Sequence, residues 1–272
     1  MTDLAYKFKG SGFEAPEEKR KYAEPDKRLS EAFEEWMRTP ASDSGYNLAT
    51  ELLEGLEATI TEAHSLLIKY QDHPKILKSG TFISAIYNKA PDKVIVYELD
   101  IPVEYLAYEL NGKTFINNGT TGNWMGAKAK GNIINNGTTK NDMGVSAQGN
   151  MINNAAAEAH IGMYAQGNVI NNATTKDFMG WYVKGNVINN GTTGHNMGQG
   201  AEGNIINIGE APEKEIANIP ELKQYLDNLK IQLTNPNMEE VLRVLENLTP
   251  DTLTKEINAI LGKRSANLEG LL

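Results

Sequence analysis

Between Gly112 and about Glu210, apolar, glycine and asparagine positions recur with a period of 18 residues. We number positions from the glycine that opens each later unit, so that Lys113 holds position 1 of the first unit. Because a fixed short period stacks similar units that cannot bury an apolar face alone, it predicts a solenoid. We therefore expect a mainly β fold, a single-stranded β-helix of about 5–6 coils over residues 101–210, flanked by α-helical segments.

Three apolar positions define the expected core of this β-helix. Position 13 is Met or Ile, and position 17 is small or β-branched. Position 4 is always Ile: Ile116, Ile134, Ile152, Ile170, Ile188 and Ile206. Equivalent positions of successive coils stack about 4.8 Å apart, so these columns are expected to form a thin, continuous interior. Position 14 is always Gly, from Gly126 to Gly198, which indicates a corner with positive φ or close backbone packing.

Positions 5 and 6 are Asn-Asn in every complete unit, from Asn117 and Asn118 to Asn189 and Asn190. Such columns could form a polar rail for a ligand or an asparagine ladder, in which stacked amides hydrogen-bond along the solenoid. A ligand site needs one coil that differs from the others. Because the pair is constant through all the complete units, the pattern favours the ladder.

The flanking segments change period and composition. Residues 1–44 are expected to form a mobile N-terminal arm with a short amphipathic helix at 27–38. Residues 45–100 form a helical or α+β leader that packs on the solenoid, with a helix over 47–70 and a strand over 93–100. Residues 101–113 are the first, imperfect turn. Residues 211–272 are expected to form a helical cap over the open end, where unpaired backbone groups would otherwise invite association.

The frame apolar–Gly–x–x–apolar–x–Gly–x–apolar–Ile, found at 143–152 and 179–188, is the part of the repeat that carries a family resemblance. It resembles the Gly-rich β-helix repeat at the C-terminus of the large subunit of glutamate synthase, and a similar repeat in one of the subunits of formylmethanofuran dehydrogenase. The resemblance covers about residues 104–210 and implies a right-handed β-helix with a structural, non-catalytic role. The chain departs from that pattern by having Asn-Asn and Thr-Thr where those repeats carry Val and Gly-Asp. The spacing itself leaves the handedness open.

Charge and composition exclude several classes of function. The formal charge is −9; residues 113–210 hold six Lys against five Asp and Glu, so the flanks carry the remaining −10. This charge and the pI near 5 argue against a nucleic-acid-binding protein, whose phosphate contacts need clustered Lys and Arg. Cysteine is absent, which excludes a thiolate metal site and a Cys nucleophile. No apolar run of about 18 residues is present, so we expect no membrane interaction and a cytoplasmic location.

The sequence predicts no catalytic residue, no metal site and no cofactor. His160 and His195 occupy positions 12 and 11 of non-adjacent coils, so they are not expected to converge on a metal. Left-handed β-helix acyltransferases do use a solitary histidine as base, with a similar layout of helical arm, solenoid and C-terminal helix. The alternative to a structural role is therefore an enzyme or enzyme subunit of β-helix type, with a site formed between chains.

Function is sought where the repeat breaks, at positions 12, 15 and 16 of the third and fourth units. There the repeat carries a candidate partner patch of Met163, Tyr164, Phe178, Trp181 and Tyr182. Aromatic and Met clusters of this kind mark protein–protein contacts, unless the chain's own amphipathic helices cover them. We expect a non-catalytic scaffold that binds a protein partner or a second copy. The sequence specifies no small-molecule ligand.

Overall fold

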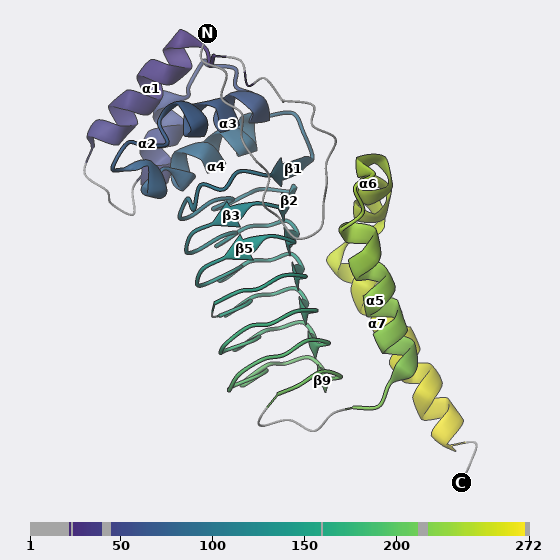
Figure 1. The fold of residues 1–272 in the computed structure, drawn as a ribbon. Coiled ribbons are helices and arrows are strands. Elements are labelled where there is room, and N and C mark those ends of the chain that lie inside the picture. The colour runs from purple at the N-terminus through teal and green to yellow at the C-terminus, as the bar shows by residue number, and fades with distance from the viewer. Residues whose placement is uncertain (1–21, 23, 40–44, 159, 212–216, 270–272) are drawn as a thin grey trace.

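The computed structural model describes residues 22, 24–39, 45–158, 160–211 and 217–269, with side chains up to residue 263. Most of the expected mobile arm lies outside the described residues. One end of the molecule is helical, and a stack of flat coils extends away from it (Figure 1). The helices at this end are α1 (Lys27–Arg38), α2 (Gly45–Leu52), α3 (Ile60–Lys69), the 3-10 helix η1 (Ile76–Lys78) and α4 (Gly80–Lys89).

The coils form a parallel β-solenoid, as the period predicts. One sheet takes a strand from each coil: β1 (Val94–Tyr97), β2 (Thr114–Asn117), β4 (Ile133–Asn135), β6 (Met151–Asn153), β7 (Val169–Asn171), β8 (Val187–Asn189) and β9 (Ile205–Asn207). These seven strands are joined by six turns of the solenoid. A second sheet pairs β3 (Thr120–Thr121) with β5 (Thr138–Thr139). From β2 onward the register advances by one repeat, as in the pairing of Ile133 with Met151.

The first turn of the solenoid is imperfect, as expected from residues 101–113. Val94 of β1 pairs with Thr114 of β2, so this turn is two residues longer than the repeat. Val103 still bridges to Thr121, and Leu106 and Leu110 are fully buried in line with the later interior columns. The sheet therefore begins at β1, before the repeat becomes visible in the sequence.

Position 3, and not position 4, faces the interior of the sheet, which corrects the expected core. The position 3 side chains are fully buried from Phe115 to Val187, together with the columns at positions 13 and 17. Successive residues of a strand point to opposite faces, so the position 4 isoleucines lie on the outer face. Because position 3 is also apolar in every unit, the pattern alone did not distinguish the two faces.

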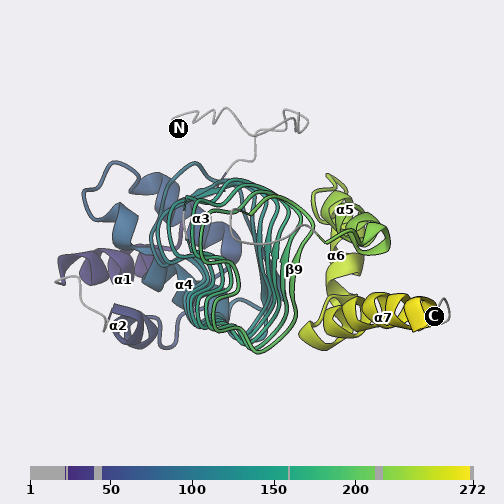
Figure 2. The same cartoon turned by 90° about the horizontal axis from the view of Figure 1, so that it is seen from below.

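The outer isoleucine column is the surface on which the C-terminal helices pack. These are α5 (Pro220–Leu233), α6 (Met238–Asn247) and α7 (Pro250–Glu269). The isoleucines form one buried cluster with Leu222 and Leu226 of α5 and Ile257 of α7. Figure 2 shows the three helices beside the coils and not beneath them. The expectation that they cover the open end is therefore wrong: they cover the flank, because that face is apolar along its whole length.

Replacing one outer isoleucine tests this packing. Ile170→Ala is expected to lower the free energy of unfolding by about 2 kcal/mol, since it removes buried methyl groups beneath the helices. Amide exchange should accelerate in α5 and α7 more than in the sheet. Thr174→Ala, an exposed change on the same coil, should alter stability by less than about 0.5 kcal/mol. Equal protection of α5 in the two variants would contradict the assignment.

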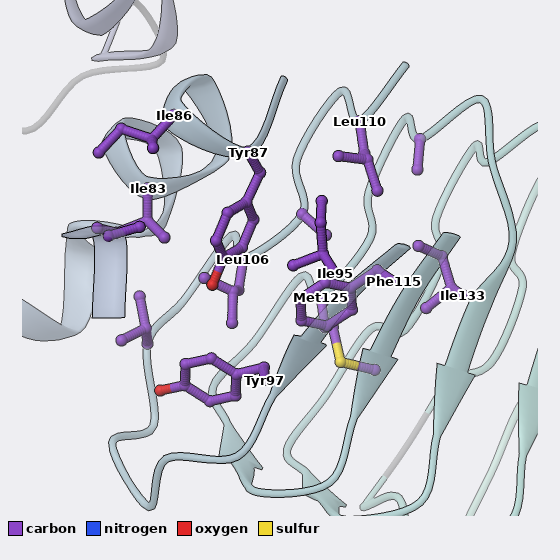
Figure 3. Close-up of a cluster of buried hydrophobic side chains, with 14 of the residues drawn as sticks. Ile83, Ile86, Tyr87, Ile95, Tyr97, Leu106, Leu110, Phe115, Met125 and Ile133 are labelled. Carbon is purple, nitrogen blue, oxygen red and sulfur yellow. The ribbon is translucent and has the colours of Figure 1, made fainter. Parts of the chain in front are cut away.

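The N-terminal helices close the first end of the solenoid with a shared core. Tyr87 of α4, Tyr97 of β1 and Phe115 of β2 lie against one another between the helices and the first coils (Figure 3). Burial raises the pKa of Tyr87 well above its usual value. His64 of α3 is buried among these rings, and its Nε2 lies 3.0 Å from the Tyr87 hydroxyl. The histidine is therefore packed in the core.

Asparagine ladders run along the solenoid, which confirms the interpretation of the Asn-Asn pair. At position 5 each buried side chain donates to the next, for example Asn135 Nδ2 to Asn153 Oδ1 at 2.8 Å. At position 6 a second ladder lies outside, with Asn154 Nδ2 donating to Asn136 Oδ1 at 2.9 Å. Position 2 carries a third ladder that was not predicted: Asn132, Asn150, Asn168, Asn186 and Asn204. Most of these amides satisfy one another where strands end at corners, although the buried Nδ2 of Asn150 has no acceptor among the described residues.

Candidate functional site

The candidate patch lies on a corner of the coil where the backbone repeatedly takes a left-handed conformation. Position 14 has positive φ, as the glycine column predicted; Gly162 has φ +68°. Position 16 also has positive φ, at Tyr164 (+58°) and Tyr182 (+52°). Glycine and asparagine tolerate this region, whereas a bulky residue there costs about 1–2 kcal/mol. Other coils place Lys128, Ser146 or Gly200 at this position. Two tyrosines are therefore kept at a backbone conformation that disfavours them.

The coil register brings the predicted aromatic residues into one cluster. The rings of Tyr164 and Tyr182 stack with centroids 5.8 Å apart and planes inclined by 10°. Trp181 lies against both tyrosines, at 5.7 Å and 5.3 Å. Phe178 joins the cluster through Trp181, at 5.6 Å. Met163 occupies position 15 one coil before Trp181 and is half-buried. All five predicted residues thus belong to one corner of coils three and four, which we call the aromatic corner.

The aromatic corner is open to solvent in the described structure. Tyr164 is 49% and Tyr182 is 51% exposed, among the largest exposures of any apolar side chain in the described residues. The C-terminal helices pack on the isoleucine column, so they do not cover these tyrosines. A large exposed aromatic surface on a rigid scaffold is typical of a contact site.

A second aromatic group occupies the same corner on earlier coils, where it is tied to the helical end. Tyr105 stacks on Trp124 with centroids 5.9 Å apart, and Tyr108 contacts Tyr46 of α2. The Lys128 ammonium donates to the Tyr108 hydroxyl at 2.7 Å, and this hydrogen bond raises the pKa of Lys128. These rings therefore help to join the helices to the first coils, in contrast to the exposed pair on coils three and four.

A histidine–aspartate pair borders the aromatic corner and was not predicted. His160 Nδ1 lies 2.6 Å from Asp142 Oδ1, and the imidazole meets the Phe178 ring edge-on at 4.9 Å. The signal was present in the sequence, because both residues hold position 12 in consecutive units and must stack. Trp181 adds a second polar feature: its indole Nε1–H is buried without an acceptor among the described residues.

The described residues include neither a cluster of metal ligands nor a helix that could span a membrane. Across the described ranges, no three His, Cys, Asp or Glu side chains come together as metal ligands. No helix in the described part of the chain is long and apolar enough to cross a membrane. The chain matches no protein-family model, no curated protein and no solved structure. Function must therefore be argued from the corner itself.

Replacing Tyr182 by glycine separates a structural role of the ring from a contact role. Glycine removes about 1 kcal/mol of backbone strain at φ +52° and loses ring contacts of similar size. Tyr182→Gly should therefore change the free energy of unfolding by less than about 1 kcal/mol, measured by urea denaturation. Val183→Gly, at the buried neighbouring position, should cost at least about 2 kcal/mol. A similar loss from both variants would show that the Tyr182 ring supports the fold.

Proposed function

We propose that this protein is a non-catalytic cytoplasmic scaffold that assembles with a protein partner through the aromatic corner. The observation that carries the proposal is the pair of half-exposed, stacked tyrosines held at positive φ. The fold imposes positive φ on position 16, and coils three and four place a large aromatic side chain there, where a neighbouring coil has Gly200. Neither the isoleucine column nor the ladders need these two rings.

The form of the corner suits a protein surface better than a small molecule. Aromatic side chains supply much contact area with little loss of conformational entropy, and they dominate interface energetics. The rings also project from a stack of coils whose interior is fully packed, so the surface is rigid before binding. The buried Trp181 Nε1–H has no acceptor among the described residues, and we expect a main-chain carbonyl of the partner to accept it.

The resemblance of the repeat frame supports the same role. The Gly-rich β-helix of glutamate synthase, and the similar repeat in formylmethanofuran dehydrogenase, suggest a structural domain inside a larger enzyme assembly. A comparable position, as a non-catalytic part of a complex, fits a solenoid whose inner columns carry no titratable cluster.

The experiment compares assemblies formed by the wild type and by a Tyr164→Ser/Tyr182→Ser variant. Native mass spectrometry and affinity capture from the source cell should show a stoichiometric partner that the variant loses while it stays folded. Ile231→Ser is the control, because Ile231 is 65% exposed on α5, away from the corner. A lone monomer that carries a bound small molecule would contradict the scaffold.

The alternative is an enzyme subunit whose site forms between two chains, and the His160–Asp142 pair is the observation that favours it. A carboxylate on Nδ1 orients an imidazole and leaves Nε2 available as a general base. If this alternative holds, His160→Gln removes an activity of the assembled complex without changing its mass. Loss of assembly with Tyr164→Ser/Tyr182→Ser and normal assembly with His160→Gln would instead support the scaffold.

A further inference from the structure

Among the described residues, the last strand of the seven-stranded sheet lacks a hydrogen bond that β2, β4, β6, β7 and β8 all make. In those strands the N–H at position 3 donates to the position 2 carbonyl of the next coil, as Val187 N does to Asn204 O at 2.8 Å. The N–H of Ile205 points to the same side, and no described residue accepts it. Beside it, the Asn207 carbonyl accepts the N–H of Ala217, where the described chain resumes. The free part of this edge is therefore the segment from Asn204 to Ile206.

The position 2 ladder also ends with an unused acceptor. In the rungs from Asn150 to Asn204, one Oδ1 accepts two N–H groups of the next asparagine. Asn186 Oδ1, for example, accepts the backbone N–H of Asn204 at 3.1 Å and its Nδ2–H at 2.9 Å. Asn204 is the last asparagine of this ladder, and no described residue donates to its Oδ1. A ligand that fills this place must bring two N–H donors close together.

An apolar contact is missing at the same rung. The position 3 side chains from Phe115 to Val187 are fully buried because the next coil covers each of them. Ile205 is 38% exposed although it ends the same column. The outer Ile206 is still buried by the C-terminal helices. One end of β9 thus offers a free N–H, a free amide oxygen and an uncovered isoleucine in a row.

We propose that the end of the solenoid at β9 binds an extended strand of another polypeptide, which pairs parallel to β9 along Asn204–Ile206 and carries the pattern Asn–apolar–apolar. Its asparagine donates its backbone N–H and side-chain amide to Asn204 Oδ1. Its main-chain carbonyl accepts the Ile205 N–H, and its first apolar side chain covers Ile205. This is strand addition at an exposed sheet edge, with the partner's sequence set by the rungs above.

The geometry favours a strand over a whole second copy of this protein. The first end of the solenoid lies under α1–α4, so a copy cannot continue the stack head to tail (Figure 1). Two copies that met by their β9 ends would pair antiparallel, and the position 2 ladder continues only in parallel register. A single extended segment has no helical end in the way, and it can pair with β9 in parallel register. This site is separate from the aromatic corner and does not depend on the function proposed for it.

The probe is a fluorescein-labelled peptide with the sequence of residues 183–188, VKGNVI, measured by fluorescence anisotropy against the full-length protein. Saturable binding is expected in the micromolar to millimolar range. The peptides with Asn186→Ala or Val187→Asp should bind at least about tenfold more weakly, and these changes leave the protein untouched. Ile205→Asp in the protein should weaken binding to a similar extent, whereas Ile231→Asp, on the exposed face of α5, should not.

Three outcomes would overturn the proposal. One is the absence of saturable binding up to about 1 mM peptide. Another is equal binding of VKGNVI and its Asn186→Ala variant, because the ladder would then play no part. The third is self-association that depends on Ile205 without any binding of the peptide, which would assign this end to a second copy. Tyr164→Ser/Tyr182→Ser should leave peptide binding unchanged, so failure of one proposal is distinguishable from failure of the other.

Discussion

Gly167→Ala is expected to lower the free energy of unfolding by at least about 3 kcal/mol, or to prevent folding at 37 °C. A Cβ at Gly167 would lie 2.1 Å from the carbonyl oxygen of Gly149 and 2.5 Å from its carbonyl carbon. Both atoms belong to the backbone of the preceding coil, so no side chain can move aside. The two coils would have to separate, which breaks the pairing of β6 with β7.

Gly262→Ala is the matched control, for which no loss of stability is expected. Gly262 lies within α7, and a Cβ there would meet nothing within 4 Å. Alanine favours a helix over glycine by up to about 1 kcal/mol, so this variant should be as stable as the wild type or more stable. Urea denaturation followed by far-ultraviolet circular dichroism measures both. A Gly167→Ala protein with the midpoint of the wild type would show that the coils tolerate a wider spacing.

Asn153→Ala is expected to cost about 3 kcal/mol, because it leaves two buried amide groups without partners. Asn153 is fully buried; it accepts from Asn135 Nδ2 and donates to Asn171 Oδ1, both at 2.8 Å. The side chains of Asn135 and Asn171 are also fully buried, so neither can hydrogen-bond to water instead. The ladder should therefore behave as a connected unit, and amide exchange should accelerate in β4 and β7 on both sides of the change.

Asn118→Ala makes the same chemical change on the outer ladder. Asn118 is exposed and accepts only from Asn136 Nδ2, which also donates to Leu233 O at 2.9 Å. The loss should be below about 0.5 kcal/mol, measured under the same conditions. If the two variants lost equal stability, burial would not be the source of the ladder's contribution.

Most residues of the aromatic corner could be predicted, because the repeat fixes which residues are neighbours in space. Residues 18 apart occupy the same place on neighbouring coils, so Tyr164 and Tyr182 had to be adjacent. The same rule would have predicted the contact of Asp142 with His160, which was overlooked because only the histidines were considered together. Whether the chain's own helices cover the corner depended on where those helices dock, and a repeat carries no information about its flanks.

The backbone conformation of the corner could not be predicted from the sequence, for a different reason. Position 16 holds Lys128, Ser146, Tyr164 and Tyr182, none of which indicates positive φ, although Gly200 does. Closure of the coil imposes this conformation on whatever residue stands there, and the neighbouring coils hold it in place. The positive φ of the two tyrosines is thus a property of the folded coil, which Lys128 and Ser146 share.

The sequence by itself determined the period, the stacking of equivalent residues, the parallel solenoid and the asparagine ladders, because each follows from one repeating unit. Only the tertiary structure decided which of two adjacent apolar columns forms the interior. Positions 3 and 4 must face opposite sides of the sheet, and both are apolar in every unit. The outer column is stable only because Leu222, Leu226 and Ile257, from helices that follow the repeat, remove it from water.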